Sequence, residues 1–90
     1  MSYEIRLSRP ARRALENELP ETVAVACLEF IYGSLAENPH RVGKPLRPPA
    51  APLYSARRGQ FRVIYDIYDD LVVVEVIDVQ HRRDVYRNLS

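Results

Sequence analysis

Apolar and charged residues alternate along residues 2–8, at the start of the chain. The apolar positions of this stretch are Tyr3, Ile5 and Leu7. A period of two is typical of a strand that buries one face. The pattern therefore predicts an N-terminal strand that packs on a core through these three side chains.

The spacing of apolar residues then changes to three and four, which predicts two helices. Ser8 followed by Pro10 fits an N-cap with proline in the first turn, so the first helix begins there and runs to about Glu18. Leu19-Pro20 ends this helix, because the residue before a proline disfavours the helical region. The second helix spans about 21–37. Its apolar stripe consists of Val23, Cys27, Phe30, Ile31 and Leu35.

Residues 38–52 contain five prolines and one glycine. This composition predicts an extended loop without packing of its own, which the prolines stiffen. Loops of this length are uncommon as simple connections, so a role beyond joining two elements is indicated.

Three strands are predicted after this loop, at about 53–58, 61–68 and 71–79. Gly59-Gln60 fits a two-residue hairpin turn of type II′, and Asp69-Asp70 fits a second two-residue turn. The three strands form a meander whose apolar face is the predicted floor for the helical hairpin.

The two turns determine which residues face each other across the meander. The predicted pairs are Arg57 with Arg62, Arg58 with Phe61, Tyr68 with Leu71, and Val63 with Val76. The apolar face then carries Tyr54, Ala56, Phe61, Val63, Tyr65, Ile67, Val72, Val74 and Val76. The opposite face is mixed and carries Ser55, Arg57, Arg62, Ile64, Asp66, Glu75, Ile77 and Val79.

The mixed face places two arginines directly opposite each other, which destabilises a sheet. An anion bound between the guanidinium groups of Arg57 and Arg62 would remove the repulsion, and phosphate suits their geometry. The alternative is that Asp66 and Glu75 offset the two charges, although the predicted pairing puts neither acid directly across from either arginine. The pattern favours the anion-binding interpretation.

Composition is that of one soluble globular domain, residues 1–90, with 47% hydrophobic and 28% charged residues. No apolar run approaches the ~20 residues of a membrane span. The start of the chain lacks the apolar segment of a secretory signal, so we expect a cytoplasmic protein. The single cysteine, Cys27, lies in the apolar helical stripe with no Cys or His at ligand spacing, which favours core packing over chemistry.

The net charge of +1 is unevenly distributed. No acidic residue occurs from Arg41 to Tyr65, a stretch with six Lys and Arg residues, and HRRDVYR is a second basic segment near the end of the chain. The two segments either converge into one anion-attracting surface or lie on two unrelated surfaces, and charge alone does not decide between these arrangements.

The order of strand, two helices, proline-rich loop, meander and HRRDVYR resembles the RelE/ParE superfamily of bacterial toxins from type II toxin–antitoxin systems, on the RelE side. The resemblance covers nearly the whole chain and is carried by NPHRVGKPLR, YSARRGQFRVIYDI and VVVEVIDVQHRRDVYR. It implies an α+β fold with a four-stranded, mostly antiparallel sheet. The N-terminal strand then lies beside the last strand of the meander, and the helices cover one face.

RelE-type toxins cut messenger RNA, typically in the ribosomal A site, without a metal or other cofactor. The resemblance therefore implies an endoribonuclease in which the 2′-OH of the RNA attacks the adjacent phosphodiester and leaves a 2′,3′-cyclic phosphate. This reaction needs a group that takes the 2′-OH proton, cations that stabilise the phosphorane, and an acid for the 5′-oxygen. The implied partners are the ribosome, mRNA and a cognate antitoxin, with no membrane or small-molecule cofactor.

Five residues match catalytic positions of the family. Arg62 matches the arginine at the scissile phosphate, Arg57 a basic position in the preceding strand, and Arg82 a C-terminal catalytic arginine. Tyr86 matches a tyrosine that stacks on a base or assists the 2′-OH, and His81 is a candidate general acid. Each also has a purely structural interpretation, as a surface charge, a packed tyrosine or a bystander histidine. The further residues expected to bind RNA phosphates are Lys44, Arg47, Arg58 and Arg83.

One position departs from the family pattern. Ser55 stands where some members carry a second basic residue, and a serine cannot act as a general base near neutral pH. Glu75 is then a candidate base, although a role in offsetting Arg57 or Arg62 is favoured. The proton acceptor is therefore left open.

Two other functions fit the same resemblance. The first is a ParE-like inhibitor of DNA gyrase, against which the His, Arg and Tyr of HRRDVYR argue. The second is a weakly active toxin that acts mainly within an antitoxin repressor complex.

Overall fold

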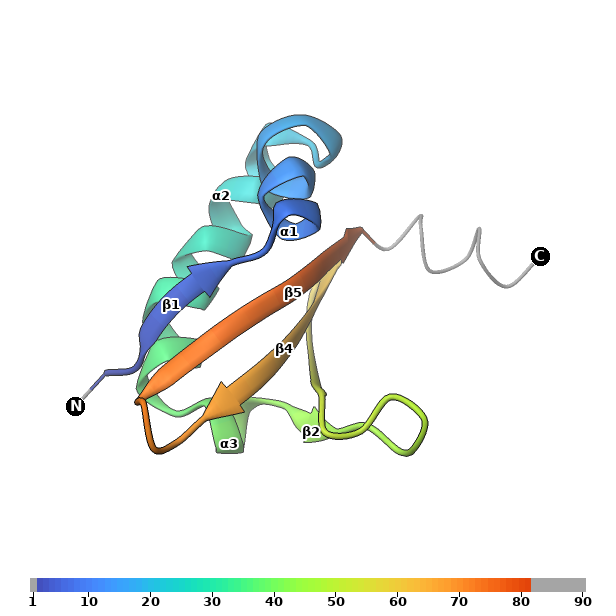
Figure 1. Cartoon of the computed structure of the whole chain (residues 1–90). Coiled ribbons are helices and arrows are strands. Elements are labelled where there is room, and N and C mark those ends of the chain that lie inside the picture. Colours follow the sequence, from blue (N-terminus) through green and yellow to red (C-terminus); the bar gives the residue numbers. More distant parts are fainter. Residues whose placement is uncertain (1, 82–90) are drawn as a thin grey trace.

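The computed structural model describes residues 2–81, which form a five-stranded sheet with the helices on one face (Figure 1). The order of the strands in the sheet is β1-β5-β4-β3-β2. The elements are β1 (Glu4–Leu7), α1 (Arg9–Arg13), η1 (Ala14–Glu18), α2 (Glu21–Phe30), η2 (Ile31–Leu35), α3 (Pro39–Val42), β2 (Lys44–Pro45), β3 (Tyr54–Arg58), β4 (Phe61–Tyr68) and β5 (Val73–His81). This confirms the α+β class and adds one strand to the predicted four.

The first helix has the predicted boundaries. The side-chain oxygen of Ser8 accepts a hydrogen bond of 3.2 Å from the backbone N–H of Ala11, as an N-cap does. The α-helical turns of α1 continue into the π-helical turn η1, which ends at Glu18. Leu19 is extended, with φ −86° and ψ 146°, because Pro20 follows it.

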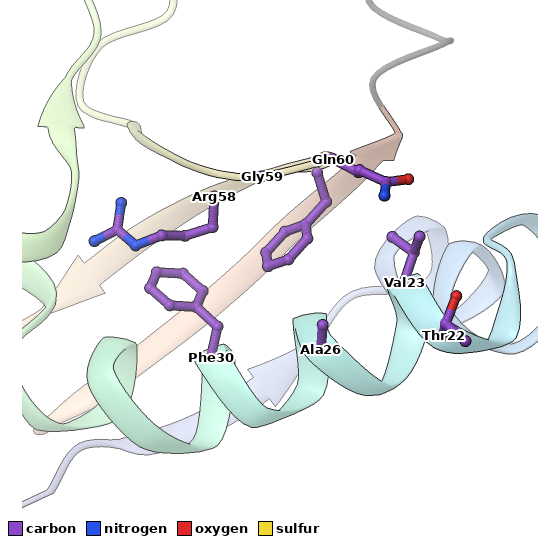
Figure 2. Close-up of a pocket in the computed structure, with 8 residues that line it drawn as sticks. Thr22, Val23, Ala26, Phe30, Arg58, Gly59 and Gln60 are labelled. Carbon is purple, nitrogen blue, oxygen red and sulfur yellow. The ribbon is translucent and has the colours of Figure 1, made fainter.

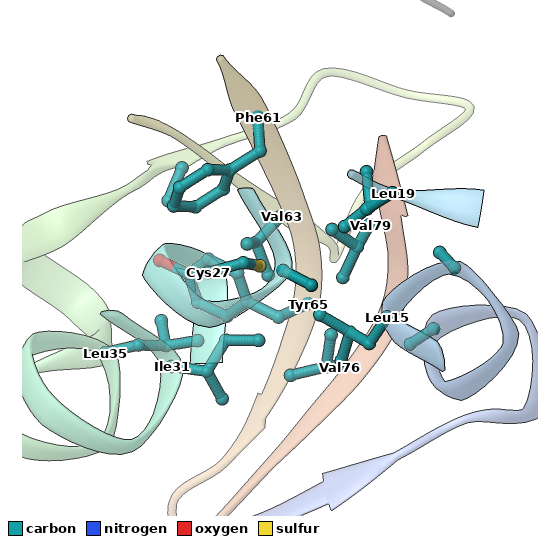
Figure 3. Close-up of a cluster of buried hydrophobic side chains, with 14 of the residues drawn as sticks. Leu15, Leu19, Cys27, Ile31, Leu35, Phe61, Val63, Tyr65, Val76 and Val79 are labelled. Atoms are coloured by element: carbon teal, nitrogen blue, oxygen red, sulfur yellow. The ribbon is translucent and has the colours of Figure 1, made fainter. Parts of the chain in front are cut away.

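The second helix supplies most of the helical contribution to the core. Its turns α2 and η2 place Cys27, Ile31 and Leu35 fully inside (Figure 3). Phe30 is half-buried and packs against the core. Burial raises the pKa of the Cys27 thiol to about 12, so this thiol stays protonated and acts as a small apolar side chain. Cys27 therefore packs the core, as predicted. None of the helices in residues 2–81 has the length and apolar character needed to cross a membrane.

Residues 38–52 were predicted to be an extended loop without packing, and this prediction is wrong for their first half. Pro39 occupies the first position of the short helix α3 and is fully buried. After it, Lys44 and Pro45 form β2 and pair antiparallel with the edge of β3. The reason is local: proline is favoured at the start of a helix, and the backbone of β3 offers unpaired groups to a short edge strand.

The other edge of the sheet is β1, which pairs with β5 as predicted. The pairing is parallel and matches Glu4 with Val73 and Leu7 with Val76. The crossover between the two strands contains the helices, which is why these lie on one face (Figure 1).

The β3–β4 hairpin has the predicted register. Arg57 pairs with Arg62 and Arg58 with Phe61. Gly59 has φ +53°, the left-handed value that the first position of a type II′ turn requires.

The β4–β5 register was predicted incorrectly. Tyr68 pairs with Val73 rather than Leu71, because the connection has four residues instead of two. Val63 pairs with Val79 rather than Val76, because the longer connection shifts the pairing by two residues and a β-bulge between the partners of Ile64 and Tyr65 shifts it by one more. A bulge inserts one extra residue into one strand and shifts the phase of every later side chain on that strand.

The bulge changes which residues of β5 face the helices. Val79 was expected on the mixed face, but it is 3% exposed and belongs to the core, where it lies near Leu19 (Figure 3). Val72 was expected in the core, but it lies in the connection and is 37% exposed. Val74 and Val76, before the bulge, are fully buried as predicted.

Candidate functional site

The face of the sheet opposite the helices carries two arginines side by side. Arg57 and Arg62 are direct partners across β3 and β4, so their Cβ atoms are roughly 5 Å apart. The ion pairs within residues 2–81 are Arg6 with Glu4 and His40 with Asp69, so no described carboxylate neutralises either arginine. Among residues 2–81, these two adjacent positive charges therefore have no ion-pair partner.

The guanidinium group of Arg62 gives a second indication of anion binding. Its side chain is half-buried, and its Nε is buried without a hydrogen-bond partner among the described residues. A buried donor that lacks an acceptor costs about 1–3 kcal/mol, and more when the group is charged. An anion bound on this face would supply acceptors to the guanidinium group and offset part of that cost.

Lys44 lies on the same face, one strand further along. It pairs directly with Ser55 of β3, and directly opposite residues share a face. Its neighbour Gly43 gives independent support: a Cβ built there would point at the buried ring of Tyr65, on the helix side of the sheet. Because successive side chains of a strand alternate, Lys44 points to the other side. We call Lys44, Arg57 and Arg62 the cationic face.

Asp78 lies on the open face near the arginines, because it pairs with Ile64, the open-face residue of β4 next to Arg62. Its carboxylate accepts hydrogen bonds from the backbone N–H of Val79 (2.9 Å) and from the side-chain amide of Gln80 (3.3 Å), and it forms no ion pair among the described residues.

Two further acidic residues of the open face lie at its far end. Asp66 and Glu75 are direct partners, and Arg6 of β1 pairs with Glu75 on its other side. Glu75 also accepts a hydrogen bond of 3.1 Å from the hydroxyl of Tyr68. Four residues along β4, about 13 Å, separate Asp66 from Arg62. The interpretation that Glu75 offsets Arg57 or Arg62 is therefore wrong.

Arg58, expected to bind phosphate, lies on the helix side instead. Its guanidinium group sits 4.9 Å from the centre of the Phe30 ring and donates hydrogen bonds to the carbonyls of Arg57 (2.8 Å) and Val42 (3.2 Å). It borders a pocket of about 450 Å³ between α2 and the β3–β4 turn, lined by Thr22, Val23, Ala26, Phe30, Arg58, Gly59, Gln60 and Phe61 (Figure 2). The structure thus separates Arg58 from the cationic face.

His81 is likewise on the helix side. It pairs with Phe61, a core residue, and is 9% exposed. The bulge in β5 accounts for this position, since it moves every later side chain of the strand to the opposite face. The structure therefore does not bring His81 together with Arg57 and Arg62.

The remaining predicted residues lie elsewhere. Arg47 is exposed in the connection between β2 and β3, where its carbonyl accepts a hydrogen bond from the N–H of Ala50. Arg82, Arg83 and Tyr86 lie outside the described residues. Within residues 2–81, no three His, Cys, Asp or Glu side chains come together in a way that would hold a metal ion.

A polar cluster that the sequence did not reveal joins α3, β3, the β4–β5 connection and the residue before β1. Asp69 accepts a hydrogen bond of 2.6 Å from Tyr3, and both of its oxygens lie within 3.0 Å of Nε2 of His40. Nδ1 of His40 lies 3.5 Å from the hydroxyl of Tyr54. The hydrogen bonds from Tyr3 and His40 hold the pKa of Asp69 below its usual value. These residues are far apart in the chain, so no local pattern marks them.

A family model matches most of the chain. The model for the family described as the ParE toxin of type II toxin-antitoxin system, parDE, matches residues 5–86. The chain belongs to the RelE/ParE superfamily of type II toxins.

Within the superfamily the chain is RelE-like. It is 47% identical to "Toxin RelE" of Mycobacterium tuberculosis over 94% of this chain and 87% of that protein. It is 45% identical to "Toxin RelG" of the same organism over 97% of this chain and 99% of that protein. Among solved structures, the toxin–antitoxin complex RelBE2 of M. tuberculosis contains a chain with 43% identity and a TM-score of 0.87, with 91% of this chain and 93% of that chain covered.

Proposed function

We propose that this RelE-like toxin is an endoribonuclease that cuts messenger RNA on the ribosome without a metal ion. The observation that carries the proposal is the pair Arg57 and Arg62, adjacent on the open face and without a described carboxylate partner. Guanidinium groups match the geometry of phosphate oxygens, so this pair suits an RNA phosphodiester.

The proposed reaction uses the RNA's own nucleophile. The 2′-oxygen attacks phosphorus and loses its proton, the bond from phosphorus to the 5′-oxygen breaks, and the 5′-oxygen gains a proton. The products are a 2′,3′-cyclic phosphate and a 5′-hydroxyl. Arg57 and Arg62 neutralise the negative charge that grows on the non-bridging oxygens in the transition state, which is where fixed cations lower a barrier most.

Arg82 and Tyr86 remain the proposed C-terminal participants, in phosphate contact and in base stacking or 2′-OH assistance. Arg83 and Arg47 are proposed to contact phosphates outside the cleaved linkage. His81 and Arg58 are not given catalytic roles, because both point to the helix side of the sheet.

An antitoxin partner is also proposed. The M. tuberculosis RelBE2 structure is described as a toxin–antitoxin complex, and its toxin-like chain covers almost all of this one. A cognate antitoxin that covers the cationic face would keep RNA away from it. A toxin that acts mainly inside such a repressor complex would show weak cleavage on its own.

Gyrase inhibition is the second candidate, because the matching family model is described by ParE toxins. The two candidates predict different cellular responses. A gyrase poison induces the DNA damage response, whereas a ribosome-dependent nuclease leaves cut transcripts and stops translation.

Primer extension on a reporter transcript after induced expression tests the proposal. Cuts in translated message, absent from an untranslated copy and absent with Arg62→Ala, are expected. Arg12→Ala is the control, because it removes one positive charge from the exposed side of α1, on the other layer of the fold. Intact transcripts together with DNA damage signalling would favour the gyrase function instead.

A further inference from the structure

Next to the Arg57–Arg62 pair, a row of directly paired residues across the sheet (a rung) contains a cation that comes from neither β3 nor β4. Lys44 of β2 pairs with Ser55 of β3, and Ser55 pairs with Ile64 of β4. In this row of paired residues the positive charge comes from Lys44 on β2, whereas β3 contributes only the neutral hydroxyl of Ser55. Among the described residues, Lys44 takes part in no ion pair.

The geometry puts Lys44 within reach of a phosphate that the arginines hold. Ser55 and Arg57 are two residues apart on β3, roughly 7 Å, and neighbouring strands lie about 4.8 Å apart. The Cα atoms of Lys44 and Arg57 are then about 8 Å apart, and the flexible four-carbon stem of lysine can span much of that distance.

We propose that Lys44 is a further catalytic cation of the site and binds a non-bridging oxygen of the phosphate between Arg57 and Arg62. The proposal rests on the endoribonuclease function argued above. Two planar guanidinium groups side by side cover one side of a phosphate, whereas an ammonium group is a compact charge with three rotatable donors. Lys44 thus provides from β2 the charge that Ser55 does not provide from β3.

The fold holds Lys44 in this place although β2 has only two residues. The carbonyl of Pro39 accepts a hydrogen bond of 2.6 Å from the buried hydroxyl of Tyr65, which fixes α3 just before β2. Behind β2, the N–H of Leu46 donates a hydrogen bond of 2.8 Å to the carbonyl of Leu53. The backbone of Lys44 is therefore anchored on both sides.

Cleavage of a translated reporter in a cell-free translation reaction tests the proposal. Lys44→Ala is expected to lower the cleavage rate on the order of 10²-fold, as loss of one preorganised donor does, with an unchanged thermal midpoint. Lys44→Arg is expected to keep most of the activity. Lys44→Ala combined with Ser55→Lys is expected to recover at least about tenfold, because positions 44 and 55 share a rung.

Arg12→Ala is the matched control for net charge and is expected to cleave at the wild-type rate. A wild-type rate for Lys44→Ala would overturn the proposal, and so would a double variant no faster than Lys44→Ala. Either result, obtained while Arg62→Ala remains inactive, would leave the endoribonuclease function standing. If the wild-type protein itself left translated RNA intact, both proposals would fall together.

Discussion

The hydroxyl of Tyr65 lies 2.6 Å from the carbonyl oxygen of Pro39 and joins the middle of β4 to α3. Both residues are fully buried. Tyr65→Phe leaves the buried carbonyl without its donor, so the free energy of unfolding should fall by about 1–3 kcal/mol. Urea denaturation measures the change. Tyr32→Phe, at a side chain that is 58% exposed, is the control and should change the value by less than about 0.5 kcal/mol.

The same tyrosine predicts a loss of stability at alkaline pH. Burial raises the pKa of Tyr65 to about 12 from an ordinary value of 10.0, and the nearby Tyr54 adds to the shift. The stability that protonated Tyr65 contributes is complete below pH 10 and is lost as the pH rises through about 12. The difference in unfolding free energy between wild type and Tyr65→Phe should therefore shrink over this range. A difference that stays constant would show that Tyr65 ionises normally in the folded protein.

Substitution by alanine should change the unfolding free energy in opposite directions at Gly43 and Gly33. A Cβ at Gly43 would collide with the Tyr65 hydroxyl and lie 2.9 Å from the carbonyl oxygen of Ser55. Gly43→Ala should therefore lower the unfolding free energy by roughly 1–3 kcal/mol and displace Lys44. Gly33 is in η2 with nothing within 4 Å of its Cβ position, so Gly33→Ala should stabilise by roughly 0.5–1 kcal/mol. Thermal or urea unfolding of both variants checks the pair.

Local signals in the sequence were sufficient for the elements that depend on local physics. The N-cap at Ser8 and the helix end before Pro20 follow from backbone chemistry within a few residues. The β3–β4 register follows from Gly59, because a two-residue turn leaves one pairing. For this reason the adjacency of Arg57 and Arg62 was predictable.

The parts of the structure that the sequence did not predict depend on contacts between residues that are far apart in the chain. The bulge in β5 leaves only a weak trace: buried valines occur at 74 and 76, and the next is at 79 rather than 78. Ile77 hides this change of phase, since it is apolar on the face that faces away from the core. The position of His81 on the helix side follows from the same change of phase. The pairing of Lys44 with Ser55 likewise needs α3, which depends on Tyr65, 26 residues from Pro39.

The Asp69 carboxylate predicts a loss of stability in acid. Hydrogen bonds from Tyr3 and His40 lower its pKa from the ordinary value of 3.8. Its contribution is present above pH 3.8 and is lost as the pH falls through the lowered value. Asp69→Asn should thus be less stable than wild type near neutral pH, and the gap should close in strong acid. Asp70→Asn, which removes the carboxylate at the neighbouring position of the same connection, is the control variant.

The cationic face predicts a conflict between stability and activity. Arg57 and Arg62 repel each other across the strands, so Arg57→Gln should raise the unfolding free energy by a few tenths of a kcal/mol at low salt while it lowers RNA cleavage. The gain should fade as salt increases, because the Debye length drops to about 10 Å at 0.1 M. Sulfate, which can bind between the two guanidinium groups, should stabilise wild type more than Arg57→Gln, and Arg12→Gln should respond to sulfate as wild type does. Chemical denaturation at matched ionic strength in chloride and in sulfate measures both effects. A clear loss of stability in Arg57→Gln would instead mean that Arg57 has a structural partner, and the face would then not be an anion-binding site.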